Sequence, residues 1–236
     1  MVIINYAGRL GNNMLQYAAA KIFSNKFKIK LITPPISGWV DFTSYINPNI
    51  NNEYLEYTSS QTIIVNNENF LNLLSKDDIL KCNYVFSDFF QINEFVTNYE
   101  NEIKKVFIDQ TEKKSGVFLH YRIGDIENTP NMLQLDYYLD CLNQINLYNG
   151  VITSDSPNHK NVKIISEKFN LTIIEKTPLE TIDLGRQYNN LILSEGTFSW
   201  FIGLLSNADN IFFNKRERFW HGDIFTSKKW IGLNYN

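Results

Sequence analysis

The sequence predicts an α/β fold in which strands and helices alternate, and three observations lead to this prediction. Short runs of β-branched and aromatic residues recur along the chain, and many are followed by segments with apolar side chains at helical spacing. The chain also opens with a strand, a glycine-containing loop and a helix in direct succession. Finally, a polar segment at residues 107–115 separates two halves. Such alternation is typical of parallel, doubly wound sheets.

The first half begins with a strand at residues 2–4, a loop at Gly8-Arg9-Leu10-Gly11 and a helix from Asn12 to about Asn25. Asn12 or Asn13 is the expected N-cap of this helix, since asparagine side chains accept hydrogen bonds from helix N-termini. The pattern is weaker between residues 36 and 80, which are rich in Asn, Ser and Tyr. The other predicted elements of this half are strands at 29–32, 63–65 and 83–86, and helices at 70–74 and 95–106.

The second half shows the alternation more clearly. It contains predicted strands at 117–120, 150–153, 172–174, 191–193 and 210–213, and predicted helices at 137–145, 161–169, 181–188 and 197–205. The polar segment at 107–115 suits a boundary between domains. We therefore predict two domains, at residues 1–112 and 113–236.

Composition narrows the classes of partner and compartment. The net charge is 22 − 25 = −3 and the pI is about 5.7, so neither nucleic acid nor an anionic membrane is an expected partner. A nucleotide ligand remains compatible, because one or two local cations suffice for a diphosphate. Cys82 and Cys141 lie far apart in sequence and are expected to be free thiols. The opening residues lack a signal peptide pattern, and no apolar run reaches about 18 residues. We expect a soluble cytoplasmic protein without an integral membrane segment, at most peripheral at a membrane.

Ligands of parallel sheets bind outside the carboxyl ends of the strands, and four segments follow predicted strands directly. In the first, Gly8–Asn13, glycines let the backbone approach a ligand, and the helix that follows offers N–H groups to an anion. A tight turn would need the same glycines. In the second, Arg122 can bind two phosphate oxygens with its planar guanidinium. It can equally form an ion pair with Asp125, while His120 can be a hydrogen-bonded core residue.

The third segment is Thr153-Ser154-Asp155-Ser156-Pro157, where a carboxylate can accept hydrogen bonds from a guanine edge or a ribose. The same side chains can instead cap the helix that follows. The fourth is the segment from Ser194 to Trp200, whose backbone and hydroxyl donors can hold a second phosphate. Its alternative interpretation is another helix cap, with Phe198 and Trp200 in the core.

The sequence gives no pattern for a metal site. His120, His159 and His221 are dispersed, and no Asp-x-Asp pair occurs. We therefore expect no metal cofactor, and expect Arg122 and helix N-termini to neutralise a leaving diphosphate. The chain also lacks the Gly-x-Ser-x-Gly of many hydrolases and a complete dinucleotide-binding fingerprint.

Taken in order, these segments resemble the α-1,2-fucosyltransferases of glycosyltransferase family 11, which are related to protein O-fucosyltransferases and α-1,6-fucosyltransferases. Residues 8–18 are similar to the family opening Gly-Gly-Leu-Gly-Asn-Gln-Met-Phe-Gln-Tyr-Ala, and His120-x-Arg122-x-Gly124-Asp125 is similar to its His-x-Arg-Arg-Gly-Asp signature. Further similar segments are Phe89-Phe90-Gln91 followed by Phe95, Leu135-Asp136-Tyr137-Tyr138, Ser154-Asp155, Phe198-Ser199-Trp200 and Lys229-Trp230-Ile231. The resemblance spans nearly the whole chain.

The resemblance implies a GT-B-like fold of two Rossmann-type α/β domains, with the donor site in the C-terminal domain and the acceptor side in the N-terminal domain. It implies a metal-independent, inverting transfer of L-fucose from GDP-β-L-fucose to a hydroxyl of a glycan acceptor, at position 2. The implied partners are therefore a GDP-sugar donor and a glycan.

The resemblance also suggests roles for individual residues. Arg122 would bind the β-phosphate, and Asn12 and Asp125 complete the catalytic candidates. Asp125 and Glu195 are candidate general bases by position alone. The candidate donor-binding residues, besides Arg122, are Gly11, His120, Ser154, Asp155, Thr197, Phe198 and Ser199. Asn13 replaces a glutamine of the family, and Ile123 replaces its second arginine. The Ile123 replacement keeps a transferase of another GDP-sugar as an alternative, beside a non-catalytic module that binds nucleotides or glycans.

Overall fold

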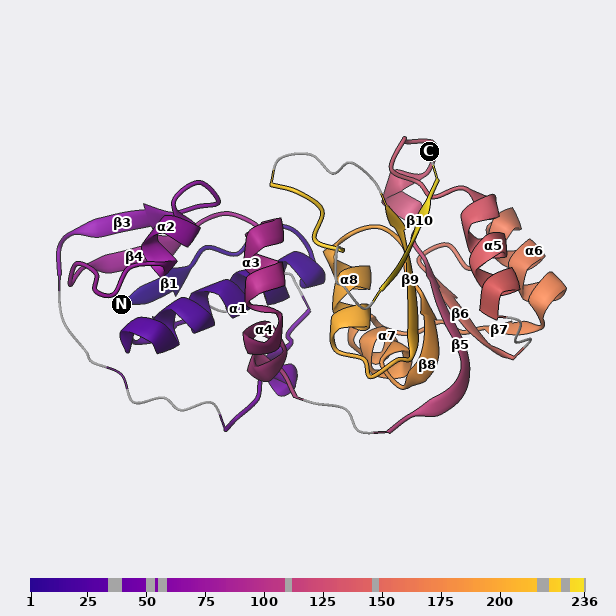
Figure 1. Cartoon of the computed structure of the whole chain (residues 1–236), viewed down its shortest axis with the longest axis horizontal. Coiled ribbons are helices and arrows are strands. Elements are labelled where there is room, and N and C mark those ends of the chain that lie inside the picture. Colours follow the sequence, from indigo (N-terminus) through magenta and orange to yellow (C-terminus); the bar gives the residue numbers. More distant parts are fainter. Residues whose placement is uncertain are drawn as a thin grey trace. The chain divides into compact units, whose positions relative to one another are not determined.

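The computed structural model divides into two compact units (Figure 1). The first unit contains Met1–Asp109 and Phe219–Ile224, and the second contains Gln110–Arg218 and Phe225–Asn236. The structure describes residues 1–33, 40–49, 54, 59–108, 112–145, 149–215, 221–225 and 230–235. Lys229, quoted above for its resemblance, lies outside these residues.

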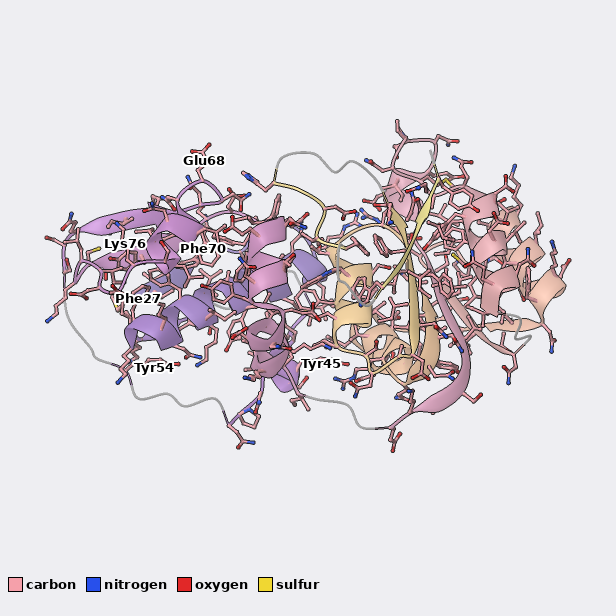
Figure 2. All side chains as sticks on the ribbon, viewed as in Figure 1. Phe27, Tyr45, Tyr54, Glu68, Phe70 and Lys76 are labelled. Atoms are coloured by element: carbon pink, nitrogen blue, oxygen red, sulfur yellow. The ribbon has the colours of Figure 1, made fainter. Side chains whose placement is uncertain are left out.

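The first unit is built on a parallel sheet of four strands in the order β2-β1-β4-β3. Alternation along the strands turns Val2, Ile4, Tyr84 and Phe86 into the core. Phe70 lies inside this unit, within 4.9–5.9 Å of the rings of three other phenylalanines (Figure 2). The elements are β1 (Val2–Ile4), α1 (Leu10–Phe27), β2 (Leu31–Ile32), η1 (Thr43–Tyr45), β3 (Thr62–Val65), α2 (Phe70–Leu74), β4 (Asn83–Phe86), α3 (Asn93–Asn98) and α4 (Glu100–Val106).

The second unit is built on a parallel sheet of six strands in the order β10-β9-β8-β5-β6-β7. Its elements are β5 (Lys114–Tyr121), η2 (Gly124–Ile126), α5 (Leu135–Ile145), β6 (Gly150–Ser154), α6 (Lys160–Phe169), β7 (Leu171–Ile173), α7 (Pro178–Gly185), β8 (Tyr188–Ile192), α8 (Thr197–Leu204), β9 (Asn210–Lys215) and β10 (Ile231–Asn234).

Helices cover both faces of the six-stranded sheet, α5 and α6 on one face and α7 and α8 on the other (Figure 1). On the first face, Leu119 and Tyr121 of β5 share a core with Tyr138 and Val162. On the opposite face, Gly185 of α7 packs closely on the β5 side chain of Phe118. The chain therefore leaves β5 toward one face and leaves the neighbouring β8 toward the other. A crevice for ligands forms at such a switch point in α/β sheets.

This architecture confirms the predicted α/β class with Rossmann-type units, but several predicted boundaries were wrong. α1 begins at Leu10 with Arg9 at its N-cap, so neither Asn12 nor Asn13 caps it. The predicted helix at 95–106 is two helices, because Tyr99 leaves the helical conformation with φ −116° and ψ 21°. No strand was predicted after residue 213, but β10 follows β9 in sequence and pairs with it.

The helix predicted at 181–188 begins and ends earlier, and local chemistry explains its start. Pro178 occupies its first turn, and Thr177 and Glu180 form a reciprocal capping box. Residue 188 instead begins β8.

The two cysteines and the membrane prediction can also be compared with the structure. Cys82 and Cys141 are thiols and not a disulfide, as predicted, and both are buried. Within the described part of the chain, no helix has both the length and the apolar character needed to cross a bilayer.

Candidate functional site

The switch point of the second sheet brings two of the four predicted segments together. The backbone N–H of Arg122, just after β5, donates a hydrogen bond to Oγ of Ser194, just after β8, at 3.1 Å. The hydroxyl of Tyr138 on α5 donates to the same oxygen at 3.0 Å. Ser194 is 2% exposed, so these bonds are shielded from water. The ends of the two central strands are therefore held in a fixed relation.

The guanidinium of Arg122 pairs with the carboxylate of Asp125. Nε and Nη2 of Arg122 donate to the two carboxylate oxygens of Asp125 at 3.1 and 2.7 Å. The ion pair considered in the sequence analysis is thus present. Its side chains are 29% and 34% exposed, so solvent reaches the pair and it adds little to stability.

Gly196 leaves space for this guanidinium. A Cβ on Gly196 would lie 2.6 Å from Nη1 of Arg122, and the residue has a φ of 94°, which favours glycine. Any other residue here would displace Arg122. The turn before α8 therefore fits the arginine side chain.

His120 is a neutral hydrogen-bonding group. Its Nδ1 lies 2.7 Å from Oγ of Ser199, and the same oxygen accepts from the backbone N–H of Ser194 at 2.9 Å. Burial lowers the pKa of His120 to about 4, and Arg122 adds to the lowering while Asp155 opposes it. The Phe198 ring packs edge-on against the imidazole, with centroids 5.2 Å apart. His120 is therefore uncharged near neutral pH.

Asp155 organises the loop that carries Arg122. Its Oδ1 accepts hydrogen bonds from the backbone N–H groups of Ile123 at 2.8 Å and Gly124 at 3.1 Å. The predicted alternative, in which this segment caps α6, was wrong because the His159 side chain caps that helix. Asp155 thus connects the end of β6 to the loop after β5.

Ile123 does not face the crevice. Its side chain is fully buried in the core cluster beneath α5 and α6. A cation at this position would meet apolar side chains in the observed conformation, which is costly. The replacement of the family's second arginine is therefore part of the hydrophobic core in this chain.

A pocket of about 130 Å³ opens at the carboxyl ends of β5, β6 and β7. Ile174, Pro178 and Phe198 form its apolar walls. Thr153 is 3% exposed, and its Oγ1 has no hydrogen-bond partner among the described residues, although buried hydroxyls are normally paired. The polar lining residues are His120, Thr153, Ser154, Asp155, Lys176 and Thr181. Apolar walls with a few convergent polar groups are typical of small-molecule sites.

Comparison with known proteins bears on the fold. No protein-family model matches the chain. No curated protein matches it either. Among solved structures, an Arg-to-Lys mutant of Arabidopsis thaliana FUT1 in complex with GDP matches with a TM-score of 0.51 and 11% identity, over 88% of this chain and 68% of that one. The chain has a GT-B-like fold. Its assignment to glycosyltransferase family 11 stays a prediction.

Within this GT-B-like fold, the predicted site residues are divided between the two units. The second unit contains His120, Arg122, Asp125, Ser154, Asp155, Thr197, Phe198 and Ser199. Four of them, His120, Ser154, Asp155 and Phe198, line the pocket. Gly11 and Asn12 belong to the first unit, where both lie in the first turn of α1, although Gly11 was predicted in the loop before that helix. The candidate base Glu195 is only 5% exposed, whereas Asp125 is accessible. The roles proposed for all these residues stay predictions.

Sequence reasoning placed Thr153 in the third candidate segment but included neither Thr153 nor Lys176 among the donor-binding residues. Thr153 pairs with His120 across β5 and β6, so its position follows from strand register. Lys176 follows β7, and applying the carboxyl-end rule to every predicted strand would have drawn attention to it. No described group of three or more His, Cys, Asp or Glu side chains has the arrangement of a metal site.

Proposed function

We propose that this protein is a glycosyltransferase that uses a GDP-sugar donor and binds the nucleotide in the pocket of the second unit. The observation that carries the proposal is the buried, unpaired Thr153 hydroxyl in a pocket next to the Arg122 loop. This pocket has the apolar walls and polar groups that a nucleoside needs. The GT-B-like fold and the GDP complex of the matching FUT1 structure support the same proposal.

Arg122 binds the donor diphosphate in this proposal. Its guanidinium is partly exposed and already oriented by Asp125 and by the space above Gly196. The N-terminus of α8 adds backbone N–H groups and the positive end of a helix dipole to the same crevice. Negative charge grows on the diphosphate as the sugar leaves, so Arg122 stabilises the transition state more than the ground state.

The finer part of the proposal is the reaction implied by the resemblance to family 11. An acceptor hydroxyl of a glycan, at position 2, attacks the anomeric carbon of GDP-β-L-fucose, the bond to the β-phosphate oxygen breaks, and the configuration inverts. The leaving GDP takes the bonding electrons, and the hydroxyl proton passes to a carboxylate or to water. Asp125 is the more accessible of the two candidate bases. No metal ion takes part in this scheme.

A second candidate is a transferase that uses another GDP-sugar. The observation that favours it is Ile123, whose buried side chain leaves Arg122 as the one cation in the segment from His120 to Asp125. A third candidate is a module that binds nucleotides or glycans without turnover. Nucleotide affinity and turnover together distinguish the three.

The test is a panel of GDP, GDP-fucose, GDP-mannose, UDP and ADP, measured by thermal unfolding and by slow hydrolysis of each sugar donor. We expect GDP and GDP-fucose to stabilise most, and we expect both effects to be lost in Arg122→Ala. The Arg122→Lys variant keeps the charge without the planar fork, so it should recover only part of the affinity.

The matched control is Lys113→Ala, which removes a cation that pairs with Asp209 at 2.6 Å in the second unit. It should bind GDP as the wild type does. Best stabilisation by UDP or ADP would refute a GDP donor, and hydrolysis of GDP-mannose alone would favour the second candidate. Donor binding with no hydrolysis or transfer would favour the third. Loss of turnover in EDTA would contradict the metal-independent scheme.

A further inference from the structure

Phe90, which follows the carboxyl end of β4 in the first unit, has a strained backbone conformation. Its φ is 55°, in the left-handed region that bulky residues avoid, although its ring is fully buried beside Phe70 and Phe86. Such strain costs on the order of 1–3 kcal/mol and is concentrated at functional sites. The packing of the ring keeps the residue in place.

Hydrogen bonds fix the turn at Phe90 and at the residues just before it. Its N–H donates to Oδ1 of Asn67 at 2.9 Å, and the N–H of Phe89 donates to Oδ1 of Asp88 at 2.8 Å. The second carboxylate oxygen of Asp88 accepts from the N–H of Asn67 at 3.1 Å. The turn is therefore held by a closed set of contacts.

The result of this turn is that Phe89 lies outside the core with 39% of its surface exposed. Its ring rests against Gly8, just after the neighbouring strand β1, since a Cβ on Gly8 would lie 2.9 Å from Cε1 of Phe89. Gly8 has a φ of 78°, so glycine is favoured there for its conformation as well as for space. The Phe89 ring therefore lies at the carboxyl ends of β1 and β4, which are adjacent parallel strands.

Amide side chains lie beside this ring. Nε2 of Gln91 donates to Oδ1 of Asn12 at 2.9 Å, and within the described residues Oε1 of Gln91 has no hydrogen-bond partner. Below them, Gln16 accepts from the N–H of Ala7 at 3.2 Å and donates to the carbonyl of Asp88 at 2.9 Å. Gln16 therefore joins the two loops that carry the aromatic ring and the amides.

We propose that Phe89, Asn12 and Gln91 form a carbohydrate platform that binds a pyranose ring. A pyranose presents a flat face of C–H groups that packs on an aromatic ring, and a rim of hydroxyls that hydrogen-bond with amides. Single exposed apolar residues are common, and Ile64 and Leu80 in the same unit are 52% and 62% exposed. Three features distinguish Phe89: it adjoins the strained residue Phe90, its ring packs against Gly8, and amide side chains lie beside the ring. Its assignment as the acceptor subsite, though not as a sugar site, rests on the proposed function.

The experiment is saturation-transfer NMR on the full chain with methyl β-D-galactopyranoside, methyl β-D-glucopyranoside and methyl α-D-mannopyranoside, each with and without GDP. At least one glycoside should receive saturation, most strongly at its ring C–H protons. The Phe89→Ala variant should bind that glycoside about three- to tenfold more weakly. Phe89→Tyr should retain the affinity because it keeps the ring. The exposed control Leu80→Ala should bind as the wild type does.

Saturation of none of the three glycosides overturns the platform, and so does unchanged affinity in Phe89→Ala. If Phe89→Ala does not fold, Phe89→Leu decides, since it keeps apolar volume without a flat ring and should lose affinity. GDP signals report separately on the second unit and should survive in every Phe89 variant. Glycoside binding without GDP binding would defeat the proposed function and leave the platform standing.

Discussion

At the scale of single residues, Arg122 shows how a structural contact and a ligand-binding role can belong to one side chain. Its ion pair with Asp125 is bidentate but solvent-accessible, and exposed pairs contribute only about 0.2–1 kcal/mol. A diphosphate offers more negative charge and pairs of oxygens that the guanidinium can bind in the same bidentate way. The pair therefore orients the guanidinium at low cost and can be exchanged for a ligand.

This exchange predicts the effect of Asp125→Asn. Removing the carboxylate charge removes a competitor for Arg122, so GDP affinity should rise by up to about fivefold, the equivalent of an exposed ion pair. Isothermal titration calorimetry with GDP measures the change. Asp209→Asn is the control, because it removes the carboxylate from the exposed Lys113 pair and should leave GDP affinity unchanged. Weaker GDP binding in Asp125→Asn would mean that the carboxylate supports the ligand site.

His120 predicts a pH dependence of stability. Its pKa is about 4 in the folded chain and about 6.5 when unfolded, so between these values the unfolded chain binds more protons. The contribution of His120 to the free energy of unfolding is complete above pH 6.5 and is lost as the pH falls toward 4. Below pH 4 this contribution no longer changes with pH. The full contribution amounts to about 3 kcal/mol. Urea unfolding from pH 4 to 7.5 should show a shallower pH dependence in His120→Gln. Equal slopes in the two proteins would contradict the buried neutral imidazole.

At the scale of elements, the turn between β8 and α8 makes room for Arg122. Gly196→Ala should lower the free energy of unfolding by about 1–3 kcal/mol, because φ is unfavourable for alanine. It should also weaken GDP binding, since its methyl group would displace the guanidinium. Gly116→Ala is the matched control, with a φ of 134° on β5 but remote from the crevice. The Gly116→Ala variant should lose stability but keep its affinity for GDP. Unchanged GDP affinity in Gly196→Ala would separate the turn from the site.

The elements also show which features can be read from sequence. Strands such as β5 and β6 and helices such as α6 carry strong periodic patterns, and the carboxyl-end rule then locates His120, Arg122 and Asp155. The burial of Ile123 is different, because it depends on how one loop residue turns under α5. Whether the hydroxyl of Thr153 finds a hydrogen-bond partner depends on how three strands and two helices pack around it. Such details depend on packing between distant parts of the chain, which cannot be read from a local sequence pattern.

At the scale of the whole molecule, the two units are not simple halves of the sequence. Residues 219–224 belong to the first unit, where the N–H of Asn93 donates to the carbonyl of His221 at 2.9 Å. Sequence composition marks the polar segment at 107–115 but gives no sign of this return. The two candidate binding sites nevertheless each lie within one unit. Ligands for one unit can therefore be followed separately from ligands for the other.

This separation predicts where GDP protects the backbone. GDP at about 100 times its Kd stabilises the state that binds it by about 2.7 kcal/mol. Hydrogen exchange should slow most around residues 120–125, 153–155 and 194–199, which surround the crevice of the second unit. Exchange in β1 and β4 of the first unit should change far less. Arg122→Ala measured with the same GDP concentration is the control and should show little protection. Strongest protection in the first unit would place the nucleotide there and overturn the assignment of the donor pocket.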